Sequence, residues 1–162
     1  MIRSALLAAT LLAAAPAAAQ EVVRHRTPGS TFPIAMAVEV PAGATTVMVS
    51  GMVPAVTDAN APRNSLAAFG DTRTQTASVL SRIEASLKSI GLSLGDVVRM
   101  QVFLVGDPGR GGRMDFDGFM AAYTEQFGTQ TQPNLPARSV MQVAGLVNPG
   151  WLVEIEVTAV RR

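Results

Sequence analysis

The chain has 162 residues and no cysteine, and its 13 Lys and Arg residues nearly balance its 12 Asp and Glu residues. The absence of cysteine excludes disulfide bonds, thiol nucleophiles and cysteine-ligated zinc sites. Basic residues are scattered and there is one Trp and one Tyr, so the composition favours neither nucleic acid nor an anionic membrane as a partner. The length is that of a single domain.

The first 19 residues have the features of a secretory signal peptide. Arg3 gives a positive start, residues 5–15 are an almost unbroken Ala and Leu run, Pro16 ends it, and residues 17–19 satisfy the small-x-small cleavage rule. The alternative is a retained membrane anchor, but the apolar run is shorter than the roughly 20 residues that a membrane span needs. We therefore expect a mature chain that begins at Gln20, with no net charge and no membrane attachment after cleavage. The Ala and Leu bias is typical of bacteria and predicts the periplasm or the cell exterior.

The first part of the mature chain predicts a tail and two strands. Residues 20–30 mix charges with Pro and Gly and are interpreted as a loose or edge-pairing tail. Residues 34–40 alternate in the period of a strand, and residues 45–50 form a second strand after a Pro-Ala-Gly turn, so a hairpin is the economical interpretation. Residues 52–70 carry further turn signals and are expected to be a long surface excursion.

Two helices follow from the apolar spacing. The first is predicted over residues 71–90, where Asp71 can cap the start, Gly91 suits the left-handed end, and one stripe recurs at spacings of three and four: Leu80, Ile83, Leu87 and Ile90. The second opens at Asp115 and ends at Gly128, with an inner stripe made of Phe116, Phe119, Met120, Tyr123 and Phe127.

The remaining segments complete an α+β pattern. Residues 97–105 predict a buried strand, residues 106–113 a flexible loop, and a Pro-rich approach leads to a strand that starts near Arg138 and to a last strand over residues 152–160. This order predicts a two-layer α+β domain with its helices on one face of the sheet. In the last strand, Val153, Ile155, Val157 and Ala159 should face the helices, and Leu152, Glu154, Glu156, Thr158 and Val160 should face away. Such a mixed outer face commonly packs against a second copy, so we expect a homo-oligomer.

Several motifs look catalytic but have a structural interpretation. Residues 91–95 match G-x-S-x-G, yet a helix precedes the serine and a strand follows it, which reverses the order that a nucleophile elbow needs. The loop of residues 106–113 lacks the spacing of a phosphate-binding loop. Asp115 and Asp117 are interpreted as cap and first-turn residues, and His25 as a solvated tail residue.

Arg138 and Glu154 form the candidate site that remains. Arg138 stands at the start of a strand, after Pro133 and Pro136 stiffen the approach. Its guanidinium can hold a carboxylate through two parallel hydrogen bonds, a contact worth roughly 1.5–3 kcal/mol. Glu154 lies on the outward face of the last strand, where a hairpin through residues 147–150 could bring it near to hold and polarise a water. A plain cross-strand salt bridge between the two residues remains an open alternative.

Five segments of this chain carry a resemblance to a known family. They are VSG at residues 49–51, the stretch of residues 71–98, AAYTEQF at residues 121–127, PARS at residues 136–139 with the stretch up to residue 146, and VEIEVTAV at residues 153–160. Together these segments resemble the RidA/YjgF family. The similarity runs from about residue 33 to residue 160. The chain is identified as a member of this family, with residues 31–162 as the RidA-like domain.

The resemblance implies a chorismate-mutase-like (YjgF-like) α+β domain with a mixed β-sheet, which assembles as a homotrimer with clefts between subunits. It also implies hydrolysis of reactive imines and enamines, such as 2-aminoacrylate and 2-iminobutanoate, to 2-keto acids and ammonia. No metal and no organic cofactor is implied. The family arginine that binds the substrate carboxylate matches Arg138, and the family glutamate credited with positioning water matches Glu154.

Some positions depart from the family pattern. Ile34 stands where many deaminases have a cleft tyrosine, Met120 where an asparagine is common, and Val140 where a cysteine often follows the arginine. Ile34, Met120 and Val140 are therefore expected to line, together with Arg138, a more apolar substrate-binding cleft.

Competing functions follow from this pattern. The first is an exported 2-imino acid and enamine deaminase, a hydrolase supplied with imines made outside the cytoplasm, for instance by amino-acid oxidation. The alternative is a non-catalytic RidA-like module that binds a small carboxylate through Arg138. The remaining possible functions are a different enzymatic activity in the same cleft and a structural role.

Overall fold

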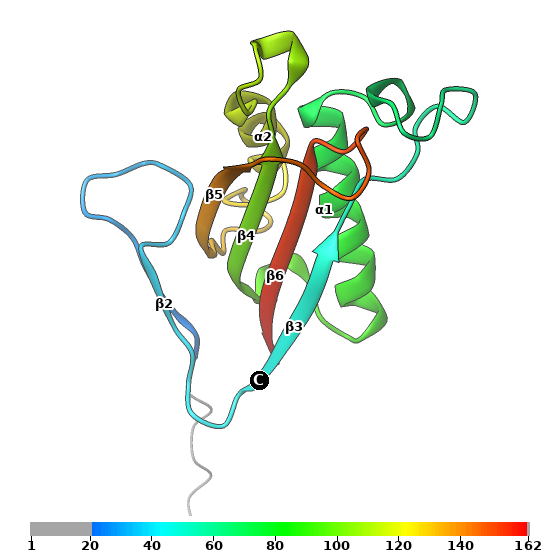
Figure 1. Cartoon of the computed structure of the whole chain (residues 1–162). Coiled ribbons are helices and arrows are strands. Elements are labelled where there is room, and N and C mark those ends of the chain that lie inside the picture. The colour runs from blue at the N-terminus through cyan, green and yellow to red at the C-terminus, as the bar shows by residue number, and fades with distance from the viewer. Residues whose placement is uncertain (1–20, 162) are drawn as a thin grey trace, which may run out of the picture.

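The computed structural model of the chain describes residues 21–161, so the predicted signal peptide lies outside the described residues. Within residues 21–161, four strands form a sheet in the order β3 (Thr45–Met52), β6 (Val153–Arg161), β4 (Val97–Val105) and β5 (Ala137–Val143). β4 and β5 run parallel, and the other neighbours are antiparallel. Both helices, α1 (Thr72–Ser89) and α2 (Phe116–Tyr123), lie behind the sheet in Figure 1. The predicted α+β domain, with a mixed sheet and its helices on one face, is confirmed.

The remaining elements are short. β1 (Val23–His25) and β2 (Ala37–Glu39) pair as an antiparallel ribbon that lies beyond the β5 edge of the sheet (Figure 1). Single 3-10 turns occur at Leu66–Ala68, Leu94–Asp96 and Pro108–Arg110. β1 therefore lies within the segment interpreted as a tail, and its partner is β2 and not an edge strand of the sheet.

The helix ends follow the local chemistry that the sequence indicates. The Asp71 carboxylate accepts a hydrogen bond of 2.8 Å from the Thr74 amide, which holds the pKa of Asp71 below its ordinary value. Because that pKa is lower in the folded state, the cap stabilises the fold at neutral pH, and its contribution is lost as the pH falls through the folded-state value. Gly91 takes the left-handed conformation after α1, with φ +76°. α2 is shorter than predicted and ends at Tyr123, although the chain continues in turns to Gly128.

The core lies between the helices and the inner face of the sheet. Val153, Ile155, Val157 and Ala159 alternate along β6 and are at most 3% exposed, which confirms their predicted direction. The prediction for Leu152 is wrong, because Leu152 is 2% exposed and packs in the core. Val160 is 1% exposed, although its position next to Ala159 in β6 keeps it on the opposite face, as predicted. Leu152 precedes β6, and its amide donates to the buried Gln75 side chain at 2.7 Å, so it belongs to the core.

The two predicted hairpins are wrong. Residues 34–40 do not pair with residues 45–50, because β2 pairs with β1 and β3 pairs with β6. β5 and β6 are not neighbours either, because β4 lies between them and pairs with both. The alternating pattern of each strand was sufficient to identify it, but strand partners are set by long-range packing of the apolar faces.

Arg24 fastens the ribbon to the domain. Its Nη1 donates to the carbonyl oxygens of Val97 at 2.9 Å and Leu135 at 2.8 Å, and its Nη2 donates to Gly95 at 3.0 Å. Val97 is the first residue of β4, and Gly95 and Leu135 lie in the segments that lead into β4 and β5. The ribbon is thereby held beside the start of β5, which is where the sequence places Arg138.

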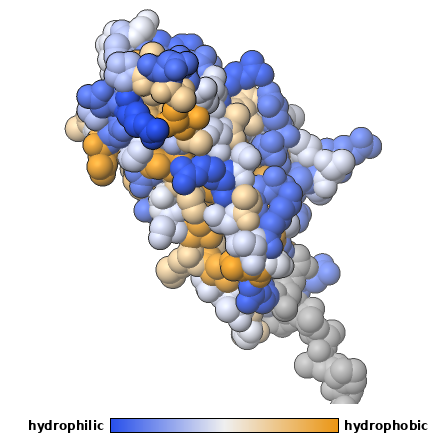
Figure 2. Space-filling model, turned by 90° about the vertical axis from the view of Figure 1, so that its right-hand side faces the viewer, coloured by the Kyte–Doolittle hydropathy of each residue, from blue (hydrophilic) through white to orange (hydrophobic). Residues whose placement is uncertain are grey.

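The surface is mixed. On the side shown in Figure 2, hydrophilic residues dominate and hydrophobic residues form small patches between them. Neither helix in residues 21–161 combines the length and the apolar character that crossing a membrane would require.

The Arg24 anchor gives a test of how the ribbon is held. We expect Arg24→Met to lower the free energy of unfolding by about 2 kcal/mol, because three carbonyl acceptors lose a charged donor. Urea unfolding of the mature chain measures it, with Arg26→Met, at an exposed position two residues further on, as the matched control. Equal stability of the two variants would contradict the assignment.

Candidate functional site

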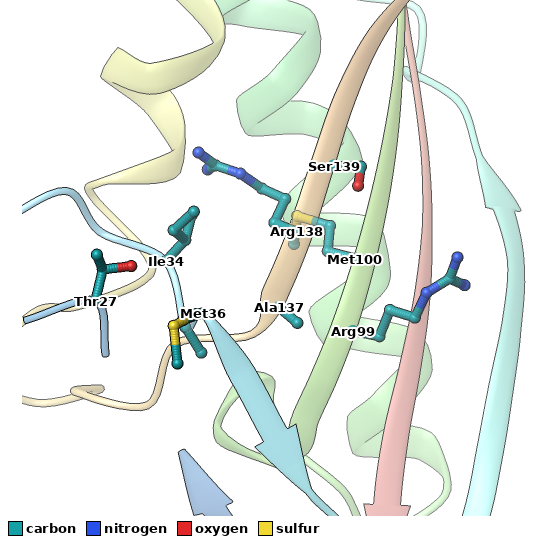
Figure 3. Close-up of a pocket in the computed structure, with 9 residues that line it drawn as sticks. Thr27, Ile34, Met36, Arg99, Met100, Ala137, Arg138 and Ser139 are labelled. Carbon is teal, nitrogen blue, oxygen red and sulfur yellow. The ribbon is translucent and has the colours of Figure 1, made fainter. Parts of the chain in front are cut away.

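Arg138 is the second residue of β5, at the edge of the sheet. It is paired in parallel register with Met100 of β4, which is 1% exposed and faces the helices. Paired residues share a face, so the Arg138 side chain lies on the helix side of the sheet. The N-terminal segment crosses the β5 edge here, where the Ala35 amide donates to the Pro136 carbonyl at 3.0 Å. Figure 3 shows Arg138 and Arg99, on neighbouring strands, pointing to opposite sides.

Aromatic rings surround the guanidinium. Its central carbon lies 4.1 Å from the ring centroid of Tyr123, 4.9 Å from that of Phe119 and 5.8 Å from that of Phe32. Nη2 donates to the Met120 sulfur at 3.2 Å. Such ring contacts stabilise a cation by about 0.5–2 kcal/mol without neutralising its charge.

The charge of Arg138 has no acidic partner among the described residues. None of the ion pairs found in residues 21–161 includes it. Its Nη1 is buried and has no hydrogen-bond acceptor within that part of the chain, and the same holds for the Tyr123 hydroxyl. A buried donor without an acceptor costs roughly 1–3 kcal/mol, which an incoming anion would recover.

Burial also shifts the acid–base properties of this pair. Desolvation lowers the pKa of Arg138 from its ordinary value, although the guanidinium remains protonated at neutral pH. Burial raises the pKa of Tyr123 to about 12, and the positive charge of Arg138 offsets part of that rise. At neutral pH the site therefore presents a cation beside a neutral phenol.

A cavity of about 410 Å³ lies at this edge of the sheet, and Arg138 is one of the residues that line it. Ile34, Met36 and Thr27 of the N-terminal segment line one side, and Arg138 and Ser139 of β5 line the other (Figure 3). Arg99 and Met100 of β4 reach the same cavity.

The predicted binding residues are partly brought together. Ile34 lines the cavity, and Met120 contacts the guanidinium directly. Val140 is half-buried and packs against the core two residues further along β5. It does not line the cavity.

Glu154 does not meet Arg138 within one chain. It pairs with Phe103 on β4, faces away from the helices, and lies against Gly51 of β3. β4 separates the two strands, and the two side chains occupy opposite faces of the sheet. The expected proximity is therefore wrong for a single chain, and so is the alternative of a cross-strand salt bridge.

The structural interpretations of the other motifs agree with the structure. Gly91 ends α1, and Ser93 caps the turn at Leu94–Asp96. Asp115 caps α2 by accepting from the Gly118 amide at 3.0 Å, and it also pairs with Arg110. His25, at the surface of β1, lies 2.6 Å from a Glu39 carboxylate oxygen. Residues 21–161 hold no cluster of three or more side chains suited to a metal ion.

Sequence reasoning missed the rings around Arg138. Phe119 and Tyr123 were identified as the inner stripe of the second helix, and this spacing of four residues does place both on one face. Their contact with Arg138 depends on how α2 packs on β5. Phe32 lies outside any regular pattern, and no sequence signal marks it.

Comparisons with known proteins give a consistent result. A family model described as Endoribonuclease L-PSP matches residues 33–161. A RutC family protein of Haemophilus influenzae is 31% identical over 143 residues, which cover 88% of this chain and 98% of that protein. A RutC family protein of Sulfurisphaera tokodaii is 32% identical, over 85% of this chain and 95% of the other.

Solved structures are similar along most of the chain. TdcF of E. coli, crystallised with bound serine, is 30% identical with a TM-score of 0.56, over 88% of this chain and 98% of that one. The Rid family protein YyfB of Yersinia pestis is 26% identical with a TM-score of 0.63, over 86% and 96%. The YjgF gene product of E. coli is 29% identical with a TM-score of 0.55, over 88% and 100%.

The unpaired charge of Arg138 generates a stability prediction. We expect Arg138→Met to keep the free energy of unfolding within about 1 kcal/mol of the wild type, because lost ring contacts are offset by relief from desolvation. Urea unfolding of Arg138→Met beside Arg24→Met separates an arginine that donates only to a methionine sulfur from one that donates to three carbonyl oxygens. A loss as large as that of Arg24→Met would contradict an uncompensated charge at Arg138.

Proposed function

Because the chain belongs to the RidA/YjgF family, we propose that it hydrolyses reactive 2-imino acids and their enamine tautomers to 2-keto acids and ammonia. The observation that carries the proposal is the half-buried Arg138, which lines a cavity and lacks an acidic partner within residues 21–161. The serine bound to TdcF supports it, since serine has the same α-carboxylate as a 2-imino acid.

Hydrolysis of an imine requires little more of the protein than a correct orientation of the substrate. Arg138 holds the carboxylate through parallel hydrogen bonds and fixes the imine carbon in the cavity. A water adds to that carbon, and its proton passes to the nitrogen. The resulting carbinolamine then loses ammonia and leaves the keto acid. A carboxylate that positions the water assists this addition as a general base.

Glu154 is the proposed carboxylate, and its position bears on the assembly. One chain holds Arg138 and Glu154 on opposite faces of its sheet, so the Arg138 and Glu154 that serve one substrate come from different subunits. We therefore propose an oligomer with the site in the cleft between subunits, and the family resemblance implies that this oligomer is a homotrimer. The half-exposed outer face of β6 and the cavity at the β5 edge would then face each other across that cleft.

Export is part of the proposal. Cleavage after residue 19 would deliver the domain to the periplasm or the cell exterior of a bacterium. Its imines would be produced there by a class of reaction that oxidises amino acids at the α-carbon.

A second function is favoured by a specific observation. Ile34 and Met120 place apolar groups around Arg138, and Glu154 lies on the far face of the same chain. This arrangement also suits a module that binds a small carboxylate through Arg138 without hydrolysing it.

Ammonia release separates the two functions. The mature chain from Gln20 is mixed with imines generated in situ by an L-amino-acid oxidase, and we expect faster ammonia release than from the oxidase alone. Arg138→Ala should lower kcat/KM by about 10- to 100-fold, because a charged carboxylate contact is lost. Arg73→Ala, at a surface ion pair with Glu125, is the matched control and should behave as the wild type.

A folded wild-type protein that gives no acceleration contradicts the deaminase. Binding of a 2-keto acid by that same protein, abolished in Arg138→Ala, would instead establish the binding module.

The packing of Gly51 against Glu154 gives an independent test. A methyl group at residue 51 would overlap Glu154 Oε1, at the end of a flexible side chain, so Gly51→Ala should fold and displace the carboxylate. We expect Gly51→Ala and Glu154→Gln to lower kcat by about 10-fold or more while the dissociation constant for a keto acid changes little. Gly145→Ala, where an added methyl meets nothing within 4 Å, is the control. Turnover by Gly51→Ala and Glu154→Gln equal to that of Gly145→Ala would remove Glu154 from the mechanism.

A further inference from the structure

Five aromatic rings form a continuous row that passes beside Arg138. Successive centroids from Phe127 through Tyr123, Phe119 and Phe116 to Phe32 lie 4.8, 5.6, 6.1 and 6.5 Å apart. The first three rings are at most 1% exposed, whereas Phe32 is 44% exposed. The row therefore starts in the core and reaches the surface at Phe32.

The exposed end of the row is held in place. The Phe32 ring stacks on Phe116 with an interplanar angle of 15°. Its backbone amide donates to the Ser30 hydroxyl oxygen at 3.2 Å, and its carbonyl accepts from the Ile34 amide at 2.8 Å. A ring fixed in this way offers its surface to a ligand without a large loss of side-chain entropy.

The same segment extends the apolar surface. Ile34 is half-buried and lines the cavity, and Met36, also lining it, is 58% exposed. Single exposed apolar residues are common on protein surfaces. Here the exposed Phe32 ring lies close to the Arg138 cation, since the guanidinium carbon is 5.8 Å from the Phe32 centroid. One small molecule can contact both the charge and the ring.

We propose that Phe32, backed by Phe116, is a specificity-determining subsite that selects 2-imino and 2-keto acids with an aromatic or long aliphatic side chain. This rests on the proposed function only in placing the ligand carboxylate on Arg138. The side chain then packs against the Phe32 ring and removes its exposed surface from water. A methyl or hydroxymethyl side chain leaves the Phe32 surface exposed to water.

Calorimetric titration with two keto acids tests the subsite, since these products are stable where imines are not. We expect the full mature chain to bind phenylpyruvate about 10-fold more tightly than pyruvate, from apolar area that only the larger acid buries. Phe32→Ala should reduce this ratio to less than about 3-fold, and Phe32→Leu should retain part of it. Met48→Ala, which removes an 83% exposed apolar residue on β3, is the control and should keep the wild-type ratio.

A wild-type ratio near one, or an unaltered ratio in Phe32→Ala, overturns the inference. Light scattering on the same samples examines the other possible occupant, a second copy of the chain. If Phe32→Ala changes the oligomeric state and weakens both acids equally, the ring belongs to a subunit contact and the inference is overturned.

Failure of the inference is distinguishable from failure of the proposed function. Equal ammonia release from the imines of alanine and phenylalanine would reject the subsite and retain the deaminase. Preferred binding of phenylpyruvate without any ammonia release would retain the subsite and reject the deaminase.

Discussion

A cation held among aromatic rings, with no carboxylate beside it in the described part of the chain, is the constraint around which this site is arranged. The rings of Phe119 and Tyr123 come from α2, and Phe32 comes from the segment that Arg24 fastens to the β5 edge. These groups solvate the guanidinium of Arg138 without neutralising it. The protein thus tolerates a charge that its own groups do not fully satisfy. The free-energy cost of such a group is commonly found at sites where a ligand binds.

Sheet order is the second constraint. β4 lies between β5 and β6, so the residue that grips a carboxylate and the residue that could position water occupy different strands and opposite faces. Gly51 makes room for the Glu154 side chain on the outer face, where a larger residue would overlap it. Under the proposed function, a single chain supplies two half-sites, and catalysis depends on assembly. The same geometry explains why a binding role is the natural competitor.

Local periodicity was sufficient to predict the helices and strands. Long-range packing determined the strand partners and the contacts within the site. The stripe of α1 from Leu80 to Leu87 and the alternation of β6 could be predicted because each depends on residues a few positions apart. The prediction was wrong for Ile90, which follows the last residue of α1 and is 44% exposed. Strand partners could not be predicted, since the alternating pattern of residues 34–40 fits any partner, and in the structure β2 pairs with β1. Arg138 was found from its Pro-rich approach and the family resemblance. Phe32 was not found, because its contact with Arg138 joins residues more than a hundred positions apart through the fold alone.

The most direct test of the central claim is a crystal structure of the mature protein soaked with a 2-keto acid, beside one without it. The account predicts the ligand carboxylate on the guanidinium of Arg138, within hydrogen-bond distance of two of its nitrogens, and no protein carboxylate at that position in the ligand-free crystal. An acidic side chain from a neighbouring subunit paired with Arg138 in both crystals would contradict it, because the charge would then be a structural contact and not a binding site.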